Sequence, residues 1–471
     1  MIKVDVCVIG AGSGGLSVAA GAAQMGATVA LVEKGDMGGD CLNSGCVPSK
    51  AILAAGHMAQ SAREAARFGI SLPEPAVNWR GVHDHIHGVI AAIAPNDSQQ
   101  RFESLGVTVI RAAGRFEDAH TLRAGDQLIR AKCFVLATGS SPFVPPIEGL
   151  DQVEYFTNEN IFDNSDAIDH LIVIGGGPIG IEMAQAHRRL GSEVTVMEMA
   201  RLLVKDDPEL TKIVIQRLQD EGLHLVEGGR NLRLKKTDDG RIAAYCESDK
   251  GKQCAIGSHL LIATGRRANV NGLNLEAAGV NYSPRGVDVD ARLRTSNKRI
   301  FAIGDVAGPY QFTHMAAYQA GIVIRNMLFK LPAKVDYRAV PWVTYTDPEL
   351  AHVGMSEADA KQAGREIRVL RWQFDENDRA QAEKRTEGMI KVVTTPKGVI
   401  LGASIVGIHA GELIQPWILA ISQKLKIGAM ASAIAPYPTL AEANKRIAGS
   451  FYTEKLFSSR TRALVKFLMR F

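Results

Sequence analysis

Two cysteines lie five residues apart in "GGDCLNSGCVPSK", residues 38–50, and a lysine follows the second one. Paired thiols can form a structural disulfide, hold a metal ion or act as a redox couple. Cys46 and Lys50 are four residues apart and would share a helix face if one helix carries both. Because a nearby cation lowers the pKa of a thiol, this spacing favours a reactive thiolate.

The spacing also limits how Cys41 and Cys46 could pair. Two residues five apart on a regular helix lie about 140° apart around its axis and about 8 Å apart along it. A disulfide needs Cα atoms within roughly 7 Å of each other. The pair can therefore form only where the backbone is irregular, which the intervening "NSG" permits.

Two alternatives to a redox couple are disfavoured. A zinc site needs two further thiolate or imidazole ligands, and the other four cysteines are scattered singly: Cys7, Cys133, Cys246 and Cys254. A structural disulfide would close only a short loop, and such bonds are rare in a reducing compartment. The sequence favours a redox couple.

A glycine-rich turn follows the first predicted strand. Residues 4–9, "VDVCVI", are apolar apart from Asp5 and are predicted to form a buried strand. Gly10, Gly12 and Gly15 come next, and a small-residue helix follows. A second strand ends near Glu33, about twenty residues further on, where a carboxylate can accept ribose hydroxyls. This order predicts a dinucleotide site.

The same unit recurs with Gly175, Gly177 and Gly180, and its second strand ends at Glu198. Two units indicate two dinucleotides, each with its pyrophosphate at a helix N-terminus. A carboxylate at Glu198 would repel a 2′-phosphate, so the sequence favours NAD(H) over NADP(H), although Arg201 is close in sequence.

A further pair of segments supports a doubled architecture. Residues 134–142, "FVLATGSSP", and 260–269, "LLIATGRRAN", are apolar strands that end in Ala-Thr-Gly, with Gly139 and Gly265 as the glycines. Each segment follows its own glycine unit along the chain. The matched pair predicts two homologous nucleotide domains.

Composition sets broader limits. A chain of 471 residues favours two to four domains. Its 54 Lys and Arg against 50 Asp and Glu give +4 without a basic block, so no nucleic-acid partner is expected. The chain has neither a signal-peptide pattern at its start nor an apolar run long enough to span a membrane, and we expect a cytoplasmic protein.

Together, the glycine units, the cysteine segment, the Ala-Thr-Gly segments and "IFAIGDVAG" at 300–308 resemble the class I pyridine nucleotide–disulfide oxidoreductases. These FAD enzymes include dihydrolipoamide dehydrogenase, glutathione reductase and mercuric reductase. The resemblance implies an α/β fold with two Rossmann-like domains and a C-terminal α+β interface domain that forms a homodimer. The implied boundaries are 1–150 and 270–336 for FAD, 151–269 for NAD(P)H and 337–471 for the interface.

The resemblance also assigns roles. Electrons would pass from NADH through the flavin into the Cys41–Cys46 disulfide, with Cys46 against the flavin and Cys41 exchanging with substrate. Lys50 would lie beside the flavin, with Glu182 as its ion-pair partner. The implied cofactor-binding residues are Gly10, Gly12, Gly15, Glu33, Lys50, Gly139, Asp305, Gly175, Gly177, Gly180, Glu198 and Gly265.

One motif departs from the lipoamide and glutathione enzymes, which carry a His-Pro pair followed by a glutamate near the C-terminus. This chain reads "APYPTLAEANKR", with Tyr437 in place of the histidine and with Glu442 retained. A phenol with a pKa near ~10 is a poor base at neutral pH. We expect slow exchange with dihydrolipoamide unless His314 or His409, each expected to be a packing residue, takes the role.

Mercuric reductases also have tyrosine there, but they carry a C-terminal cysteine pair, and this chain has no cysteine after Cys254. The acceptor stays open between a thiol or disulfide and a metal ion, with quinone, oxygen or a partner protein as alternatives. No resident metal is expected, and His83, His85 and His87 are interpreted as an exposed helix face. The tail "RTRALVKFLMRF" is predicted to pack on its own domain and not on a membrane surface.

Overall fold

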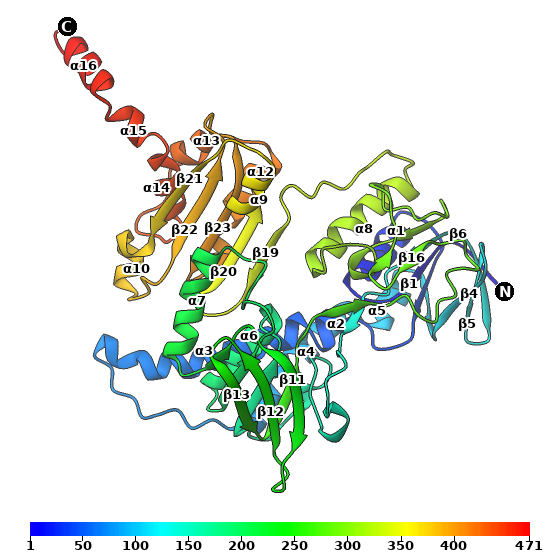
Figure 1. Ribbon diagram of the computed structural model, residues 1–471. Helices are drawn as coiled ribbons and strands as arrows, with labels where there is room; N and C mark the ends of the chain where they lie inside the picture. Colours follow the sequence, from blue (N-terminus) through cyan, green and yellow to red (C-terminus); the bar gives the residue numbers. More distant parts are fainter.

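The computed structural model describes residues 1–471 and has three units (Figure 1). The first unit is a seven-stranded sheet in the order β3-β2-β1-β6-β5-β4, with β18 beside β6. Strand β2 and the C-terminal halves of β1 and β6 are apolar and largely buried on both faces, as parallel strands are. The strands are β1 (Ile2–Ile9), β2 (Val29–Glu33), β3 (Val107–Arg111), β4 (Gly114–Asp118), β5 (Thr121–Ala124), β6 (Gln127–Leu136) and β18 (Ile300–Ala302).

Strand β18 joins this sheet from far along the chain, because Ile300 lies opposite Phe134 in a parallel pairing. Helix α8 (Thr313–Met327), which follows β18, packs against α1 (Ser13–Gln24). The approach is close, since a Cβ on Gly21 would lie 2.6 Å from Cδ1 of Ile324. The small-residue helix after the first glycine turn therefore allows the two distant segments to form one layer.

The second unit has a four-stranded parallel sheet in the order β10-β9-β8-β14 and a three-stranded antiparallel sheet, β11-β12-β13. Helices α6 (Pro178–Arg189) and α7 (Pro208–Asp220) belong to this unit. The strands are β8 (His170–Ile174), β9 (Glu193–Met197), β10 (His224–Val226), β11 (Arg230–Lys236), β12 (Ile242–Ser248), β13 (Gly251–Gly257) and β14 (His259–Ile262).

The third unit is a five-stranded antiparallel sheet in the order β19-β20-β23-β22-β21, so the fold is the α/β and α+β arrangement predicted. Helices α12 (Gln415–Ser422) and α14 (Glu442–Ser450) cover it, and fully buried Trp417 donates its indole N–H to Asn444 at 2.7 Å. The strands are β19 (Pro341–Thr344), β20 (Glu349–Gly354), β21 (Arg368–Gln373), β22 (Met389–Thr394) and β23 (Ile400–Gly407).

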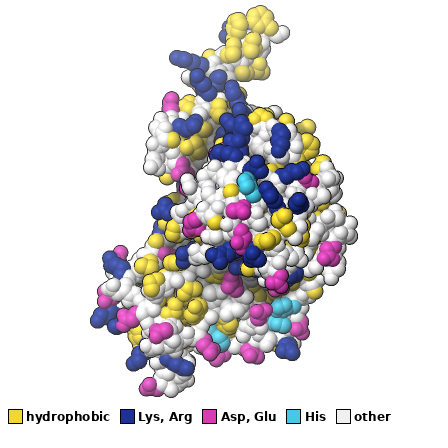
Figure 2. Space-filling model, turned by 90° about the vertical axis from the view of Figure 1, so that its right-hand side faces the viewer, with side chains coloured by type: hydrophobic (Ala, Val, Ile, Leu, Met, Phe, Trp, Pro, Cys, Tyr) yellow, Lys and Arg dark blue, Asp and Glu magenta, His cyan; other side chains and the backbone are white.

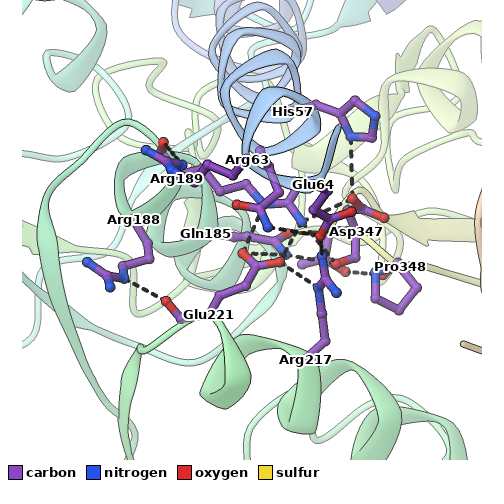
Figure 3. A network of polar contacts seen from close by, with 12 residues as sticks. His57, Arg63, Glu64, Gln185, Arg188, Arg189, Arg217, Glu221, Asp347 and Pro348 are labelled. Carbon is purple, nitrogen blue, oxygen red and sulfur yellow. Dashed lines mark hydrogen bonds and ion pairs between the residues drawn. The ribbon is translucent and has the colours of Figure 1, made fainter. Parts of the chain in front are cut away.

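Helix α3 (Cys46–Glu64) begins at the second cysteine, and its far end is fixed by a polar network among all three units (Figure 3). Buried Arg189 on α6 contacts Glu221 at 2.6 Å and Asp347 at 3.0 Å. Arg217 on α7 pairs with both Glu221 and Glu64 of α3. We call these five residues the junction network, and it holds α3 against the second and third units.

The chain ends in two short helices, α15 (Thr453–Leu456) and α16 (Ser459–Leu468), which project away from the third unit (Figure 1). Neither helix contains a buried residue, so the prediction that the tail packs on its own domain is wrong. The buried core of the third unit ends at Phe451, with Tyr452 packed against it, and no side chain from residue 453 onward joins it. No helix of the structure combines the length and hydropathy needed to cross a bilayer.

Candidate active site

In the first glycine turn, two of the glycines lie so close to neighbouring backbone that a side chain would not fit. Gly10 has φ +104°, and a Cβ there would lie 2.3 Å from the carbonyl oxygen of Ala137. A Cβ on Gly15 would lie 1.9 Å from the carbonyl oxygen of Gly10. A Cβ on Gly12 would meet nothing closer than 4.0 Å. The backbone therefore requires Gly10 and Gly15, whereas Gly12 leaves room for a ligand to approach.

The second turn repeats this geometry. A Cβ would lie 2.4 Å from the Ala263 oxygen at Gly175 and 2.0 Å from the Gly175 oxygen at Gly180, while Gly177 has nothing within 4 Å. Gly12 and Gly177 are also the N-caps of α1 and α6, and no side chain caps either helix. The first N–H groups of both helices thus remain for a pyrophosphate, which fits FAD in one unit and a nicotinamide nucleotide in the other.

The acidic residues at the strand ends occupy equivalent positions. Glu33 accepts the N–H of Ala11 at 2.6 Å, and Glu198 accepts the N–H of Gly176 at 2.6 Å. Both carboxylates therefore lie against their glycine turns, where a ribose diol would sit. Arg201 is turned away, since its guanidinium donates to Thr211 and to the carbonyl oxygens of Val204 and Asp206.

The two Ala-Thr-Gly segments lie side by side, because β7 (Ser140–Pro142) pairs antiparallel with β15 (Arg266–Ala268). Gly139 and Gly265, which precede these strands, have φ +66° and +121° and open space around them. Ser140 donates to Asp305 at 2.5 Å and accepts from Arg266 at 2.7 Å. Burial raises the pKa of the Asp305 carboxyl. Asp305 thus lies where the first sheet meets the second unit.

The backbone between the cysteines is irregular, as the spacing requires. Helix α2 (Gly39–Asn43) carries Cys41 and ends before Ser44, and α3 starts anew at Cys46. The break is tight, since a Cβ on Gly45 would lie 2.8 Å from the Asp40 carbonyl oxygen. Both cysteines are free thiols, half-buried at Cys41 and exposed at Cys46, and the two hydrogen-bond to each other.

The surroundings of the two thiols make Cys46 the more acidic of the pair. The hydrogen bond from Cys41 is the main cause that lowers the pKa of Cys46 to about 6, against the opposing effect of burial. Thr313, whose hydroxyl lies 3.4 Å from the sulfur, and the charge of Lys50 act in the same direction. The same bond raises the pKa of Cys41. Cys46 also stands at the N-terminus of α3, which favours an anion.

Lys50 is held by a carboxylate from the second unit. Its Nζ lies 2.8 Å from Oε2 of Glu182, which is 4% exposed, and 4.3 Å from the centre of the Tyr345 ring. The other oxygen of Glu182 accepts the backbone N–H of Tyr345 at 2.9 Å. The predicted pairing of Lys50 with Glu182 is therefore present, and it directs one charged lysine to the face of α3 that carries Cys46.

Tyr437 and Glu442 lie in the third unit, and within the chain no hydrogen bond or ion pair connects either of them to the cysteines. Tyr437 is exposed and donates its hydroxyl to Asp378 at 2.8 Å, a bond that raises the pKa of the phenol. Glu442 pairs instead with Arg446 at 2.7 Å. Their catalytic roles stay predictions that need a second subunit.

The two candidate histidines lie outside this cluster. His314 donates Nε2 to the carbonyl oxygen of Pro341 at 2.9 Å, and burial lowers its pKa. His409 precedes α11 (Ala410–Leu413) in the left-handed conformation, φ +56°. Neither histidine forms a hydrogen bond with a cysteine. No group of three or more potential metal ligands is present, and this includes the histidines of α4 (Trp79–Ile93).

Several residues of the site carry no sequence signal of their own. Asn158 donates to Asp40 at 2.9 Å and to the Ser44 oxygen at 3.0 Å, which supports the break between the cysteines. Arg266 reaches the same aspartate at 3.1 Å. Of these, only the Arg-Arg pair after the second Ala-Thr-Gly segment could have attracted attention in the sequence.

Comparison with known proteins agrees with this geometry. Residues 4–320 match the model of the pyridine nucleotide-disulphide oxidoreductases, and residues 340–448 match the dimerisation domain of the same family. The chain is 36% identical to a mercuric reductase of Staphylococcus aureus over 95% of its length and 82% of the relative's. It is 33% identical to a dihydrolipoyl dehydrogenase of Geobacillus stearothermophilus, over 94% of both chains.

Among solved structures, the chain is similar to the HOCl-induced flavoprotein disulfide reductase RclA from Escherichia coli. The TM-score is 0.84 at 25% identity, and the match covers 94% of this chain and 99% of that one. The two family matches and this structural match together extend over all three units. The chain belongs to the pyridine nucleotide-disulphide oxidoreductase family and is an FAD-dependent oxidoreductase.

Proposed function

We propose that this protein is a homodimeric NADH-dependent reductase in which the Cys41–Cys46 pair delivers electrons to a thiophilic metal ion. The observation that carries the proposal is the environment of Cys46, whose pKa is lowered to about 6 next to a second thiol. A thiolate beside a thiol is a ready ligand for a soft metal, and no residue of the chain near the pair is placed to act as a base for disulfide exchange.

When bound, FAD would supply hydride acceptance from NADH and two-electron transfer to the Cys41–Cys46 disulfide. The chain's own residues do the rest. Lys50 and Thr313 stabilise the Cys46 thiolate, and Glu182 fixes Lys50. Glu198 favours NADH over NADPH, because its carboxylate lies where it would accept the ribose hydroxyls and repel a 2′-phosphate, while Arg201 is bonded elsewhere. The roles of Gly139, Gly265 and Asp305 in cofactor binding are part of this proposal.

The choice of acceptor depends on proton transfer. Reduction of a disulfide substrate needs a group that takes and returns protons at the exchanging thiol. Tyr437 is a poor candidate, since its bond to Asp378 holds the phenol protonated. A metal ion needs no such group. Relatives support this choice: the family includes mercuric reductases, and RclA has been solved as a Cu(II) complex.

The test compares acceptors with the FAD-loaded dimer under anaerobic conditions, with NADH oxidation as the readout. We expect turnover with Hg(II) or Cu(II), supplied as complexes of a small thiol, to exceed turnover with lipoamide or oxidised glutathione. Cys46→Ser should lower the metal-dependent rate by at least about 100-fold. Faster turnover of lipoamide than of either metal would overturn the metal assignment.

A second variant tests the missing base. Tyr437→His should raise lipoamide turnover by about 100-fold, the usual contribution of a general base, with a bell-shaped pH dependence. The metal-dependent rate should not rise, because reduction of a metal ion needs no such base. Tyr437→Phe is the matched control, because it removes the bond to Asp378 without adding a base. No gain from histidine between pH 6 and 9 would contradict the assignment of this position to thiol exchange.

A further inference from the structure

The strongest unexplained feature is residues 453–471, which we call the basic tail. It contains five Lys and Arg residues and one Glu, so it carries the entire formal net charge of +4 of the chain. The other 452 residues have equal numbers of cations and carboxylates. The tail also lies beyond residue 448, where the match to the dimerisation domain ends.

Helix α16 and the turn after it place three of the five cations on one side and large apolar residues on the other, while Arg460 in the first turn lies on the apolar side. Arg462, Lys466 and Arg470 recur every four residues and therefore form one row along the helix. The opposite face carries large apolar side chains. They are Leu464, Phe467, Leu468 and Phe471, and the two phenylalanine rings meet edge to face at 5.5 Å. The helix is amphipathic, and Ser458 caps its first turn.

Nothing in the chain covers either face. Phe467 is 54% exposed, Leu468 58% and Phe471 96%. None of the tail's five cations forms an ion pair, although most of the other exposed arginines in the C-terminal unit, such as Arg371 and Arg379, do. Figure 2 shows the tail standing clear of the molecule, with basic and hydrophobic side chains both open to solvent.

A second copy of the tail or a lipid surface could cover the apolar face, and the charge of the tail favours one of them over the other. A second tail of the same sequence would bring two sets of unpaired cations together, and the rest of the chain offers no net negative charge. An anionic lipid surface satisfies both faces of one helix, because the cations meet the headgroups while the phenylalanine and leucine side chains enter the acyl boundary.

We propose that the basic tail binds the surface of anionic lipid bilayers and holds the enzyme there, with α16 lying in the plane of the interface. This inference is independent of the acceptor assigned above. It gives the molecule a peripheral attachment by a ten-residue helix, in a structure in which no helix can cross the membrane.

The test is co-sedimentation of the FAD-loaded protein with vesicles of phosphatidylcholine containing 30% phosphatidylglycerol, and with pure phosphatidylcholine vesicles. We expect binding to the anionic vesicles, about tenfold weaker binding to neutral ones, and a fall in binding as NaCl rises from 50 to 500 mM. The triple variant R462E/K466E/R470E should lose about tenfold or more in binding. L464S/F467S/L468S should lose binding with the charge intact.

The matched control reverses three cations on the second unit, K235E/K236E/K252E, and should bind as the wild type does. Basal turnover should be the same in all of these proteins. Equal binding by the tail variants and the wild type would overturn the proposal. So would conversion of a dimer into a monomer on deletion of 458–471, measured by light scattering, without vesicle binding by the full chain. Tighter binding to duplex DNA than to anionic vesicles at equal salt would also contradict it.

Discussion

The junction network and the basic tail both contain arginine residues, which are largely buried and paired in the network but exposed and unpaired in the tail. In the network, Arg189 is 4% exposed and each of its carboxylate partners, Glu221 and Asp347, lies within 3.0 Å. The basic tail has its cations in water without partners. Buried charges must be paired to be tolerated, whereas exposed charges cost the fold nothing.

We therefore expect the junction network to contribute to the stability of the fold and the basic tail to contribute to binding of a partner. Removing one partner from the network leaves another charge buried and uncompensated. Removing a tail cation changes only what the surface attracts. Asp347 is an example of a buried charge that is held by its partners. Burial alone would raise its pKa, but the hydrogen bond from His57 and the charges of Arg189 and Arg385 hold the pKa well below its usual range. The three predictions below test this separation, from the largest effect to the smallest.

Arg189→Ala should break the network and lower the free energy of unfolding by about 3–5 kcal/mol, since Glu221 and Asp347 lose a buried partner. Urea unfolding of the FAD-loaded protein, followed by circular dichroism, measures this. Arg460→Ala is the matched control and should change the same quantity by less than about 0.5 kcal/mol. Equal effects for the two variants would remove the distinction between the regions.

Lys50→Met removes a cation that is paired with Glu182 and that also stabilises the Cys46 thiolate. The Cys46 thiolate loses a stabilising charge, so its pKa should rise from about 6. Alkylation of the NADH-reduced enzyme at pH 6.5, read at Cys46 by peptide mass spectrometry, should slow by about threefold to tenfold. Lys466→Met removes a cation from the tail and should leave the alkylation rate of Cys46 unchanged. An unchanged rate in Lys50→Met would show that Lys50 does not contribute to the low pKa of Cys46, which the hydrogen bonds from Cys41 and Thr313 would then account for.

Deletion of residues 458–471 should have the smallest effect on stability. No side chain of α16 is buried, so we expect the free energy of unfolding to stay within about 0.5 kcal/mol of the wild type. The measurement is the same urea titration, in the absence of lipid. A loss of about 2 kcal/mol or more would mean that the tail packs against the protein in solution.

Local signals in the sequence predicted much of the fold and part of the site. The glycine units are short motifs in which two of the three glycines are required by close backbone contacts and the third leaves room for a ligand. Gly10 and Gly175 have equivalent contacts with their neighbouring strands. The irregular backbone between Cys41 and Cys46 followed from helix geometry alone. The resemblance placed Glu182, which lies 132 positions from Lys50, and the ion pair is present.

The residues that sequence reasoning missed depend on contacts between distant segments. Asn158 reaches Asp40 across 118 positions, and Thr313 reaches Cys46 across 267. An asparagine or threonine in isolation has no distinctive pattern, so only folding reveals its partner. The prediction that the tail packs on its own domain was wrong for a related reason. Its amphipathic pattern predicts a helix with an apolar face but does not specify what covers that face.

Glu182 has a consequence for exchange of parts between relatives. It belongs to the second unit, but one of its oxygens binds Lys50 from the first and the other binds the backbone of Tyr345 from the third. A chimera that swaps the third unit must therefore reproduce the path of the chain at position 345, not merely the sheet. Because the Glu182 carboxylate contacts all three units, the units cannot be exchanged independently of one another. A chimera with its breakpoints at the domain boundaries would still have to preserve both contacts of this side chain.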